Sequence, residues 1–291
     1  MSIWIKDKTV LITGSTNGIG MAAALKLAED CSSLFFTYRN DELADQLKKE
    51  LSMINPELRV QGFFCDFSNQ ESIRDCVSQI KENVTEIDLL VNNAGIVNTK
   101  YIETNAGIEQ TFAVNHIGYF LFTNLLLDVL ERTGSSRIIN VSSAAHFFVK
   151  SMNWDDLNYK EDFGMGVKSY GQSKLANILF TRYLAKRLES KNIPVNSMHP
   201  GGVNTALGSQ NKTLLGKVLK LMLKPFFRSP LKGAESIIYL AHMMDLDVTG
   251  QYFVDSKIAK TSSYSKDDAE AEKLWKISEA VSYTHLRAHE T

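Results

Sequence analysis

Residues Thr9–Gly20 read TVLITGSTNGIG, and this segment is the strongest indication of the fold. A β-branched, apolar run leads directly into a glycine-rich turn, and the helical pattern Met21–Glu29 follows. A phosphate-binding motif needs a strand, a turn and a helix in this order, because the helix N-terminus then directs its N–H groups at the phosphate. The spacing G-x-x-x-G-x-G differs from the commonest dinucleotide fingerprint, so a plain strand-to-helix turn is the alternative.

Each glycine of this turn has a distinct expected role. Gly14 allows the tight turn, Gly18 lets the backbone approach a pyrophosphate, and Gly20 lets the helix pack closely on the strand. The residues expected to hold the cofactor phosphates are therefore Gly14, Ser15, Thr16, Asn17, Gly18, Ile19 and Gly20.

The next units alternate between strand and helix patterns. Strands are predicted at Ser33–Tyr38, Arg59–Cys65, Ile87–Val91, Arg137–Val141, Val195–Met198 and Gln251–Val254. Helices are predicted at Asp41–Met53, Gln70–Asn83, Phe120–Leu130, Ser169–Leu184, Leu231–His242 and Asp267–Glu279. This rhythm predicts an α/β fold with a doubly wound parallel sheet and right-handed crossovers, formed as a single domain over residues 1–280.

The composition is that of a globular domain and argues against a nucleic-acid-binding protein. The chain has 291 residues, of which 44% are hydrophobic and 22% charged. Its 32 Lys and Arg against 33 Asp and Glu give a net charge of −1, so no basic field favours a nucleic-acid partner. Small ligands are the expected partners.

Cysteine usage and hydropathy indicate where the protein resides. Cys31, Cys65 and Cys76 are odd in number and lack C-x-x-C spacing, which favours reduced core residues of an intracellular protein. The N-terminus has no signal-peptide pattern, and the most apolar long run, Ile117–Leu130, contains Asn124 and Asp128. We expect a cytoplasmic protein without a transmembrane span.

Ligands of doubly wound sheets bind at the carboxyl ends of the strands. Those ends carry the predicted cofactor-binding residues Arg39, Asp66, Asn93, Ala94 and Gly95. Arginine suits a ribose phosphate where an acidic residue would bind the ribose hydroxyls, so Arg39 favours NADP(H) over NAD(H). The alternative is that Arg39 is a solvated turn residue.

Tyr170 and Lys174 lie four residues apart at the start of the helix pattern SYGQSKLANILFTRYL. They therefore share one helix face. A nearby ammonium favours the phenolate, so Lys174 should lower the pKa of Tyr170 and make it a usable general acid and base. On its own, the motif is also compatible with an ordinary surface pair.

Six separated motifs together resemble the short-chain dehydrogenase/reductase family. They are TGSTNGIG at Thr13–Gly20, NNAG at Asn92–Gly95, Asn115 in VNHIGYF, the serines of INVSSAAH, YGQSK at Tyr170–Lys174 and PGGVNT at Pro200–Thr205. The likeness runs from Lys6 to about Glu279. The segments VNHIGYFLFTNLLL, SKLANILFT, TGQYFVD and AEKLWKIS resemble the retinol dehydrogenase-like branch.

This resemblance implies a Rossmann fold and hydride transfer between NADP(H) and the carbonyl or alcohol of a small, lipophilic, retinoid-like substrate. It implies that Ser143 orients the substrate oxygen, with Ser142 as the fallback, and that Tyr170 exchanges the proton. Lys174 would bind the nicotinamide ribose, and Asn115 would hold a water that links Lys174 to solvent.

The resemblance also implies nicotinamide contacts and a quaternary structure. The nicotinamide side would touch Pro200, Gly201, Val203 and Thr205. A homodimer or homotetramer would form through the helices that carry Asn115 and Tyr170. Two alternative functions are reduction of a carbon–carbon double bond, as in protochlorophyllide reductases, and a non-catalytic NADP(H)-binding redox sensor.

Two segments do not belong to the alternating strand and helix pattern. The long connection His146–Val167 is expected to wall the substrate site. His146 itself is interpreted as a packing residue because phenylalanines follow it, and a substrate ligand is the alternative. Residues 212–228 have an apolar side and a basic side, ending at Arg228, and predict an amphipathic lid helix over the substrate. A peripheral membrane contact and an ordinary surface helix are the alternatives.

The last stretch, Val281–Thr291, abandons the helical pattern that precedes it and resembles a translated sequencing adapter. We therefore predict that residues 281–291 are not native. His285 and His289 belong to this stretch, so their spacing is not taken as a metal motif, and no metal site is predicted.

Overall fold

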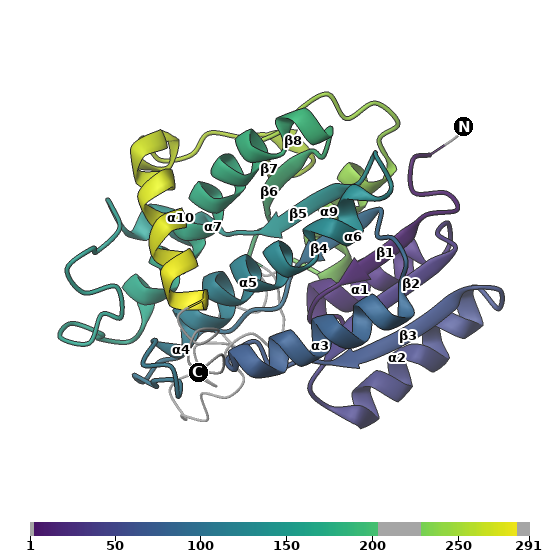
Figure 1. Ribbon diagram of the computed structural model, residues 1–291, viewed down its shortest axis with the longest axis horizontal. Helices are drawn as coiled ribbons and strands as arrows, with labels where there is room; N and C mark the ends of the chain where they lie inside the picture. Colours follow the sequence, from purple (N-terminus) through teal and green to yellow (C-terminus); the bar gives the residue numbers. More distant parts are fainter. Residues whose placement is uncertain (1–2, 203–227, 284–291) are drawn as a thin grey trace.

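An eight-stranded sheet with the order β3-β2-β1-β4-β5-β6-β7-β8 forms the centre of the molecule, shown in Figure 1. The computed structural model describes residues 3–202 and 228–283. The strands are β1 (Thr9–Ile12), β2 (Ser33–Tyr38), β3 (Arg59–Phe64), β4 (Leu89–Asn92), β5 (Arg137–Val141), β6 (Val195–His199), β7 (Tyr252–Val254) and β8 (Lys257–Ile258). Strands β1 to β7 pair in parallel, which confirms the predicted doubly wound class.

The last strand, β8, was not predicted from the sequence. It pairs antiparallel with β7 through Phe253 and Val254. The two-residue turn between them consists of Asp255 and Ser256, which both adopt positive φ, at 49° and 61°. Hairpin turns of this kind favour glycine or asparagine, so the sequence lacked the usual signal.

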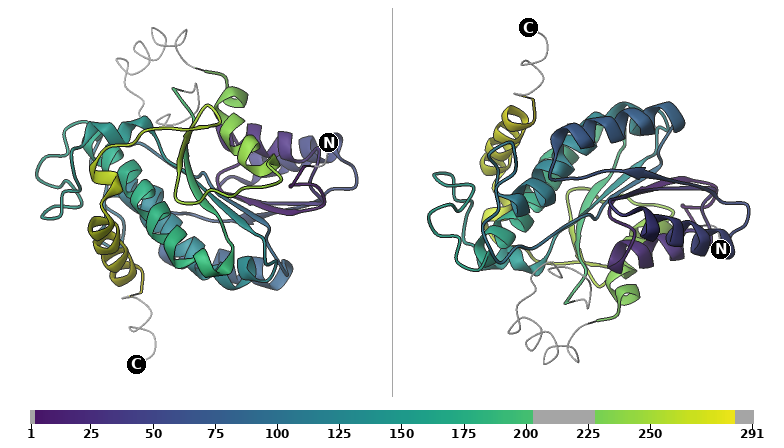
Figure 2. Two further views of the ribbon diagram at one scale, coloured as in Figure 1. Left: turned by 90° about the horizontal axis from the view of Figure 1, so that it is seen from above. Right: turned by 90° about the horizontal axis from the view of Figure 1, so that it is seen from below.

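Two helical layers cover the sheet, as the views in Figure 2 show. The α-helices are α1 (Gly18–Leu27), α2 (Asp41–Ile54), α3 (Gln70–Asn83), α4 (Gln110–Phe112), α5 (Gly118–Leu125), α6 (Leu127–Glu131), α7 (Val167–Arg187), α9 (Pro230–His242) and α10 (Asp268–Tyr283). Shorter helical turns are η1 (Ala113–Ile117), η2 (Ala144–Phe148), η3 (Glu189–Lys191) and η5 (Tyr264–Lys266). Helices α1, α2 and α9 pack on one face, and α3, α5 and α7 pack on the other.

Local sequence explains why the helices begin where they do. The Asn40 side chain accepts a hydrogen bond from the Leu43 N–H at 2.9 Å and caps α2. Asn69 caps α3 in the same way. Along α2 the buried residues Ala44, Leu47 and Leu51 recur every three or four positions, so one face of the helix packs on the sheet.

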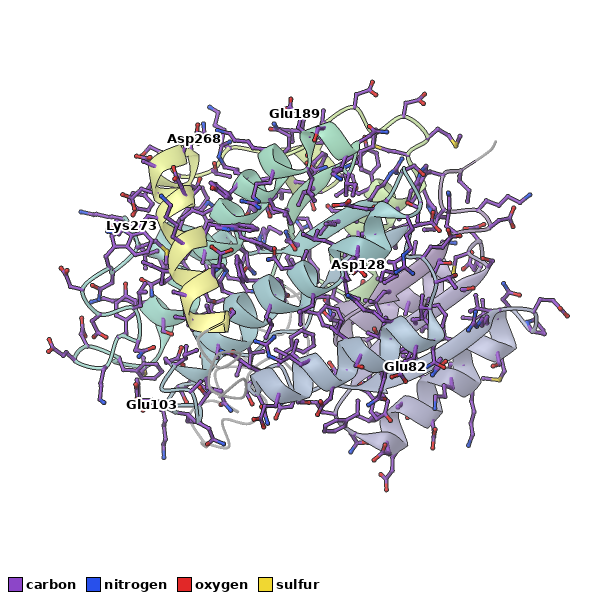
Figure 3. All side chains as sticks on the ribbon, in the orientation of Figure 1. Glu82, Glu103, Asp128, Glu189, Asp268 and Lys273 are labelled. Carbon is purple, nitrogen blue, oxygen red and sulfur yellow. The ribbon has the colours of Figure 1, made fainter. Side chains whose placement is uncertain are left out.

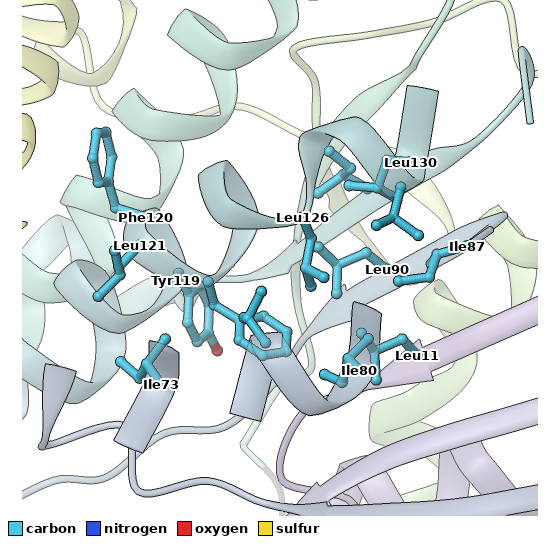
Figure 4. Packing of buried hydrophobic residues seen from close by; sticks show 14 of the residues in the cluster. Leu11, Ile73, Ile80, Ile87, Leu90, Tyr119, Phe120, Leu121, Leu126 and Leu130 are labelled. Atoms are coloured by element: carbon cyan, nitrogen blue, oxygen red, sulfur yellow. The ribbon is translucent and has the colours of Figure 1, made fainter. Parts of the chain in front are cut away.

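The larger part of the core lies between the sheet and α3, α5 and α6. Figure 4 shows Leu11 and Leu90 of the sheet beside Ile80 of α3 and Leu126 at the α5–α6 junction, and all four side chains are fully buried. Burial of such side chains is the main driving force for docking these helices on the sheet.

The segment predicted as one helix over Phe120–Leu130 is interrupted. Helix α5 ends at Leu125, and Leu126 has φ −99° and ψ 0°, outside the helical region. The preceding residues 113–117 form a π-helical turn, η1, rather than a regular helix. Such turns often occur at functional sites, and Asn115 lies in this one.

Helix α10 lies along α7 and α5 in Figure 1. Its Trp275 ring packs against Phe120 at 4.8 Å, Tyr183 at 5.0 Å and Phe180 at 6.0 Å between ring centroids. These are side chains of the helices through which a homodimer was predicted. The C-terminal helix of the same chain therefore covers that surface.

Helix α10 also extends beyond the position where the helical pattern was expected to end. Residues 281–283 continue it, and the backbone carbonyls of Val281 and Ser282 accept hydrogen bonds from Gln70 and Arg74 of α3. The predicted end of the helical pattern at residue 281 is therefore wrong, because tertiary contacts with α3 extend the helix. The non-native origin of residues 281–291 stays a prediction, and His285 and His289 lie outside the described residues.

Charged side chains gather at the periphery, where Figure 3 labels Asp128 and Asp268. The Asp128 carboxylate pairs with Lys81 at 2.8 Å, and Asp268 pairs with Lys186 at 2.6 Å and Arg182 at 3.2 Å. The second group links the start of α10 to α7, although exposed ion pairs stabilise only weakly. Within residues 3–202 and 228–283, no helix combines the length and apolar composition that crossing a bilayer requires.

Candidate active site

A cleft of about 290 Å³ opens at the carboxyl ends of the strands. The predicted residues that line it are Gly14, Thr16, Asn17, Gly18, Ile19, Arg39, Asp66, Asn93, Ala94, Gly95, Tyr170, Lys174, Pro200 and Ser142, the fallback serine. Residues that also line it but were not predicted include Thr37, Tyr38, Leu43, Cys65, Phe67, Ile96 and Val114. These residues belong to no sequence motif, so only the fold could place them at the cleft.

The glycine-rich turn has the conformation expected from its sequence. Gly14 has φ +65° and Gly18 has φ +58°, a region that favours glycine. A Cβ at Gly20 would lie 2.4 Å from Asn93 Nδ2 and 2.5 Å from the Gly14 carbonyl oxygen. Gly20 therefore permits close packing of α1 on the turn. Ser15 is fully buried and does not line the cleft, because its hydroxyl donates to the Ile12 carbonyl at 3.0 Å.

The loop after β4 holds this turn in place. Asn93 Nδ2 donates to the carbonyls of Thr13 at 2.8 Å and Gly14 at 3.0 Å. In return, Thr13 Oγ1 accepts from the N–H groups of Asn93 at 2.8 Å and Ala94 at 3.0 Å. Thr37 Oγ1, at the end of β2, accepts from the Gly14 N–H at 3.1 Å. Two neighbouring strand ends thus fix the backbone of the turn.

The start of α1 fits the pyrophosphate of a dinucleotide. Asn17 precedes the helix in an extended conformation, and its side chain makes no capping hydrogen bond. The first turn of α1 contains no acidic residue. The leading N–H groups therefore have no side-chain acceptor and point along the positive end of the helix dipole, which suits an anionic ligand.

Arg39 lies at the rim of the cleft, beyond the end of β2. Its guanidinium is 58% exposed and lies 4.0 Å from the Asp66 carboxylate. Asp66 is held by Ser68, which donates to its Oδ1 from the backbone N–H at 2.9 Å and from the hydroxyl at 2.8 Å. A long, exposed ion pair is weak, so the Arg39 side chain can turn toward a bound phosphate.

Tyr170 and Lys174 both line the cleft, but their electrostatics differ from the prediction. Burial raises the pKa of Tyr170, and a hydrogen bond with the Ser143 side chain partly lowers it. The predicted lowering of this pKa by Lys174 is therefore not observed. Lys174 Nζ lies 5.7 Å from the centre of the Tyr170 ring and donates to the Val141 carbonyl at 3.1 Å. Burial lowers the pKa of Lys174 to about 7, so this amine is only partly charged at neutral pH.

The structure distinguishes the two serines after β5. The Ser142 hydroxyl donates to the Lys174 carbonyl at 2.7 Å and is fully buried, so it links β5 to α7. The Ser143 side chain instead interacts with the Tyr170 hydroxyl and lowers its pKa, although Ser142 and not Ser143 lines the cleft. The Ser143 hydroxyl oxygen also accepts from the Ala145 N–H at 3.1 Å and caps η2. Ser143 is thus the serine positioned beside the predicted proton donor.

Asn115 lies behind the cleft, in the π-helical turn η1. Its side chain bonds both backbone groups of Ile96, at 2.8 and 2.9 Å, and donates to Ser173 Oγ at 3.0 Å. A Cβ at Gly95 would lie 3.3 Å from Asn115 Oδ1 and 3.7 Å from Lys174 Nζ, so the Gly95 backbone runs between them. The Asn115 side chain connects the loop after β4 to α7, and its water-holding role stays a prediction.

The loop after β6 is connected to β7 through Arg228. Gly201 has φ +81°, and the Arg228 side chain lies directly against it. The Arg228 N–H donates to the Gly202 carbonyl at 2.6 Å, and its guanidinium pairs with Asp255 in the β7–β8 turn. Arg228 is not helical, so the predicted extension of the amphipathic helix to this residue is wrong. Val203, Thr205 and the rest of the proposed lid, residues 212–227, lie outside the described residues.

The chain is similar to a known protein family and to proteins of known structure. The family model described as short chain dehydrogenase matches residues 8–155 and 158–214. Retinol dehydrogenase 14 of Homo sapiens is 40% identical over 290 residues, covering 94% of this chain and 86% of its own. The chloroplastic short-chain dehydrogenase TIC 32 A of Brassica napus is 36% identical, covering 95% and 89%. A blue fluorescent protein from a metagenomic library, solved with NADPH, has a TM-score of 0.67 at 26% identity, covering 86% of this chain and 96% of its own.

Proposed function

The chain belongs to the short-chain dehydrogenase family and is an oxidoreductase related to retinol dehydrogenases, and from this premise we propose its reaction. The protein transfers a hydride between NADP(H) and the carbonyl or alcohol group of a small, lipophilic molecule. The observation that carries this proposal is that Tyr170 and the buried Lys174 both line the cleft, with the Ser143 side chain beside the Tyr170 hydroxyl.

Three features of the cleft support NADP(H) as the cofactor. The uncapped start of α1 would hold the pyrophosphate, the carboxylate of Asp66 would lie near the adenosine half, and Arg39 would meet the ribose phosphate. The structural relative described above was solved with NADPH. When bound, the cofactor supplies or accepts the hydride, and the protein contributes binding, orientation and proton transfer.

The proton chemistry belongs to the chain's own residues. In the reducing direction, the Tyr170 hydroxyl donates its proton to the carbonyl oxygen while Ser143 donates a hydrogen bond to the same oxygen. A raised pKa keeps Tyr170 protonated at neutral pH, which suits a proton donor. A positive charge on Lys174 would favour the phenolate that remains after the transfer. In the oxidising direction Tyr170 takes the proton back.

Apolar side chains beside the cleft support a lipophilic substrate. Phe147 and Phe148 of η2 are 55% and 62% exposed, and Met165 and Val167 near the start of α7 are 73% and 50% exposed. The turn η2 packs against α7 close to Tyr170, since Gly171 lies against Phe148. Exposed apolar groups gathered at one place commonly mark a binding surface. The name of the human relative indicates a retinoid as a substrate of that protein.

The test measures NADPH oxidation with aldehydes and ketones, and NADP⁺ reduction with alcohols, retinoids included. Tyr170→Phe should reduce kcat by at least about 10²–10⁴-fold, because the positioned proton donor is lost. NADPH binding, measured by fluorescence titration, should persist in this variant. Near-normal turnover in Tyr170→Phe would contradict the assigned mechanism. NADPH binding without turnover of any carbonyl, alcohol or activated double bond would favour a redox sensor instead.

A further inference from the structure

His146 lies in η2, three residues after the serine that contacts Tyr170, and its side chain is fully buried. Its Nδ1 atom lies 2.7 Å from the Ser143 carbonyl oxygen. Its Nε2 atom accepts a hydrogen bond from the Ser262 N–H at 3.4 Å. The imidazole thus bridges the segment of Ser143 and the segment that follows β8, which are 116 residues apart in the sequence.

The two partners determine the protonation of the ring. A backbone N–H can only donate, so Nε2 must be the unprotonated nitrogen of a neutral imidazole. The proton is therefore on Nδ1, which donates to the Ser143 carbonyl. Burial also lowers the pKa of His146, which keeps the ring neutral. Because both nitrogens are engaged and the side chain is buried, His146 cannot exchange a proton with a substrate.

The orientation of the ring is fixed by its neighbours. The Phe147 ring lies at 3.9 Å and the Tyr252 ring lies edge-on at 5.2 Å, between ring centroids. On the other side, Ser262 belongs to a compact turn in which the buried Ser265 hydroxyl donates to the Ser262 carbonyl at 2.7 Å. The donor to Nε2 is therefore held as firmly as the ring itself.

These contacts hold Ser143 in position. Its carbonyl accepts from both the N–H of His146, at 3.2 Å, and the Nδ1 of the same residue. Its hydroxyl oxygen accepts from the Ala145 N–H at 3.1 Å. With both ends of Ser143 held, its hydroxyl is left to donate toward Tyr170 and, under the proposed function, toward the substrate oxygen.

We propose that His146 is a positioning residue for the reaction, which holds Ser143 in catalytic geometry through its Nδ1–H and is itself held by the Ser262 turn. This inference rests on the proposed function. It differs from the interpretation of His146 as a packing residue alone, because packing requires only the volume of the ring and not a donor at Nδ1.

Three substitutions separate the two roles. His146→Leu keeps most of the apolar volume and removes the donor, and His146→Asn places an amide N–H near the position of Nδ1. His146→Gln places its amide near the position of Nε2. We expect His146→Leu and His146→Gln to lower kcat by about 10–100-fold, since small displacements of a catalytic group have effects of this size. His146→Asn should recover most of the rate, and NADPH affinity should hardly change in any of the three.

The decisive measurement is a double-mutant cycle of kcat with Ser143→Ala. If His146 acts through the Ser143 hydroxyl, then His146→Leu should have little further effect once that hydroxyl is removed. His242→Leu, at a half-buried histidine of α9 that pairs with Asp30, serves as the control and should leave kcat unchanged. Circular dichroism and thermal unfolding of each variant verify that it is folded.

The outcomes distinguish this inference from the function on which it rests. If the unmodified protein turns over no carbonyl or alcohol, the proposed function fails, and if Ser143→Ala and Tyr170→Phe both retain normal turnover, the assigned mechanism fails. If those variants lose activity but the loss from His146→Leu multiplies with that of Ser143→Ala, His146 contributes only general packing and the inference is overturned. Equal rates for His146→Asn and His146→Leu would overturn it as well. If His146→Leu does not fold, the kcat values of His146→Asn and His146→Gln still test the inference. Equal values would overturn it.

Discussion

At the level of single residues, burial governs the chemistry of Lys174. Its side chain is almost completely buried and its amine donates to a backbone carbonyl, with a pKa lowered to about 7. In the unfolded chain the amine titrates at its ordinary value of 10.5, so between about pH 7 and 10.5 the unfolded state binds more protons than the folded state. Stability from this group therefore rises with pH across that window and does not change with pH below about 7, where the amine is protonated in both states.

The corresponding prediction concerns Lys174→Met. Removing the amine should take away a pH dependence of up to about 1.4 kcal/mol of unfolding free energy per pH unit between pH 7 and 10. Urea unfolding of both proteins across this range measures the difference. Lys49→Met, at an exposed lysine of α2, is the control and should keep the pH dependence of the parent. If the unfolding free energies of the parent and of Lys174→Met change with pH in the same way, the folded amine titrates normally.

A second prediction concerns Arg39 and cofactor choice. If its guanidinium binds the ribose phosphate by charge-assisted hydrogen bonds, NADPH should bind about 10–100-fold more tightly than NADH. Arg39→Ala should remove most of that preference, while Arg59→Ala, at the opposite end of the neighbouring β3, should not. Fluorescence titration with NADPH and with NADH gives the ratio of the two dissociation constants. Equal affinities in the unmodified protein would mean that the end of β2 does not recognise a phosphate.

At the level of elements, the glycine turn and α1 act as one unit with the loop after β4. Intrinsic helix propensity alone predicts that Gly20→Ala stabilises α1 by about 1 kcal/mol. The contacts at 2.4 and 2.5 Å predict the opposite sign, because the new methyl group would displace Asn93 and the turn. We expect a net loss of about 1–3 kcal/mol in unfolding free energy and weaker NADPH binding.

Thermal unfolding and cofactor titration of Gly20→Ala check this result together. Ala22→Gly, in the same helix, is the control. It should lose about 1 kcal/mol through propensity and leave cofactor affinity nearly unchanged. If Gly20→Ala is more stable than the parent and binds NADPH normally, the turn accommodates the methyl group without strain.

At the level of the whole molecule, α10 determines which surfaces are available to another subunit. Trp275 is buried against Phe120 of α5 and against Phe180 and Tyr183 of α7. The predicted homodimer or homotetramer would need this surface. We therefore expect cross-linking to place no partner subunit against the α5 and α7 surface, and a cross-link between these helices of two subunits would contradict this.

Trp275→Ala tests how firmly α10 is docked. The loss should be about 3–5 kcal/mol of unfolding free energy, the usual range for truncating a buried tryptophan. Lys276→Ala, at an exposed position of the same helix, should change stability by less than about 0.5 kcal/mol. Equal effects of the two substitutions, measured by urea unfolding, would contradict a docked α10.

The sequence alone predicts the order of strands and helices, the parallel sheet, the glycine turn and Arg39 at its carboxyl edge, and the shared helix face of Tyr170 and Lys174. These features follow from local patterns, because periodicity and turn residues act within about ten positions of one another. The left-handed conformations of Gly14 and Gly18 and the close packing at Gly20 agree with that reasoning.

Other features depend on contacts between segments that are far apart in the chain. The pKa of Tyr170 depends on burial and on Ser143, and the role of His146 depends on Ser262, 116 residues away in the chain. The covering of α5 and α7 by α10 likewise joins segments that no local pattern connects. Burial, and contacts between distant segments, depend on how the whole chain packs, and these set the electrostatics and exposed surfaces of the molecule.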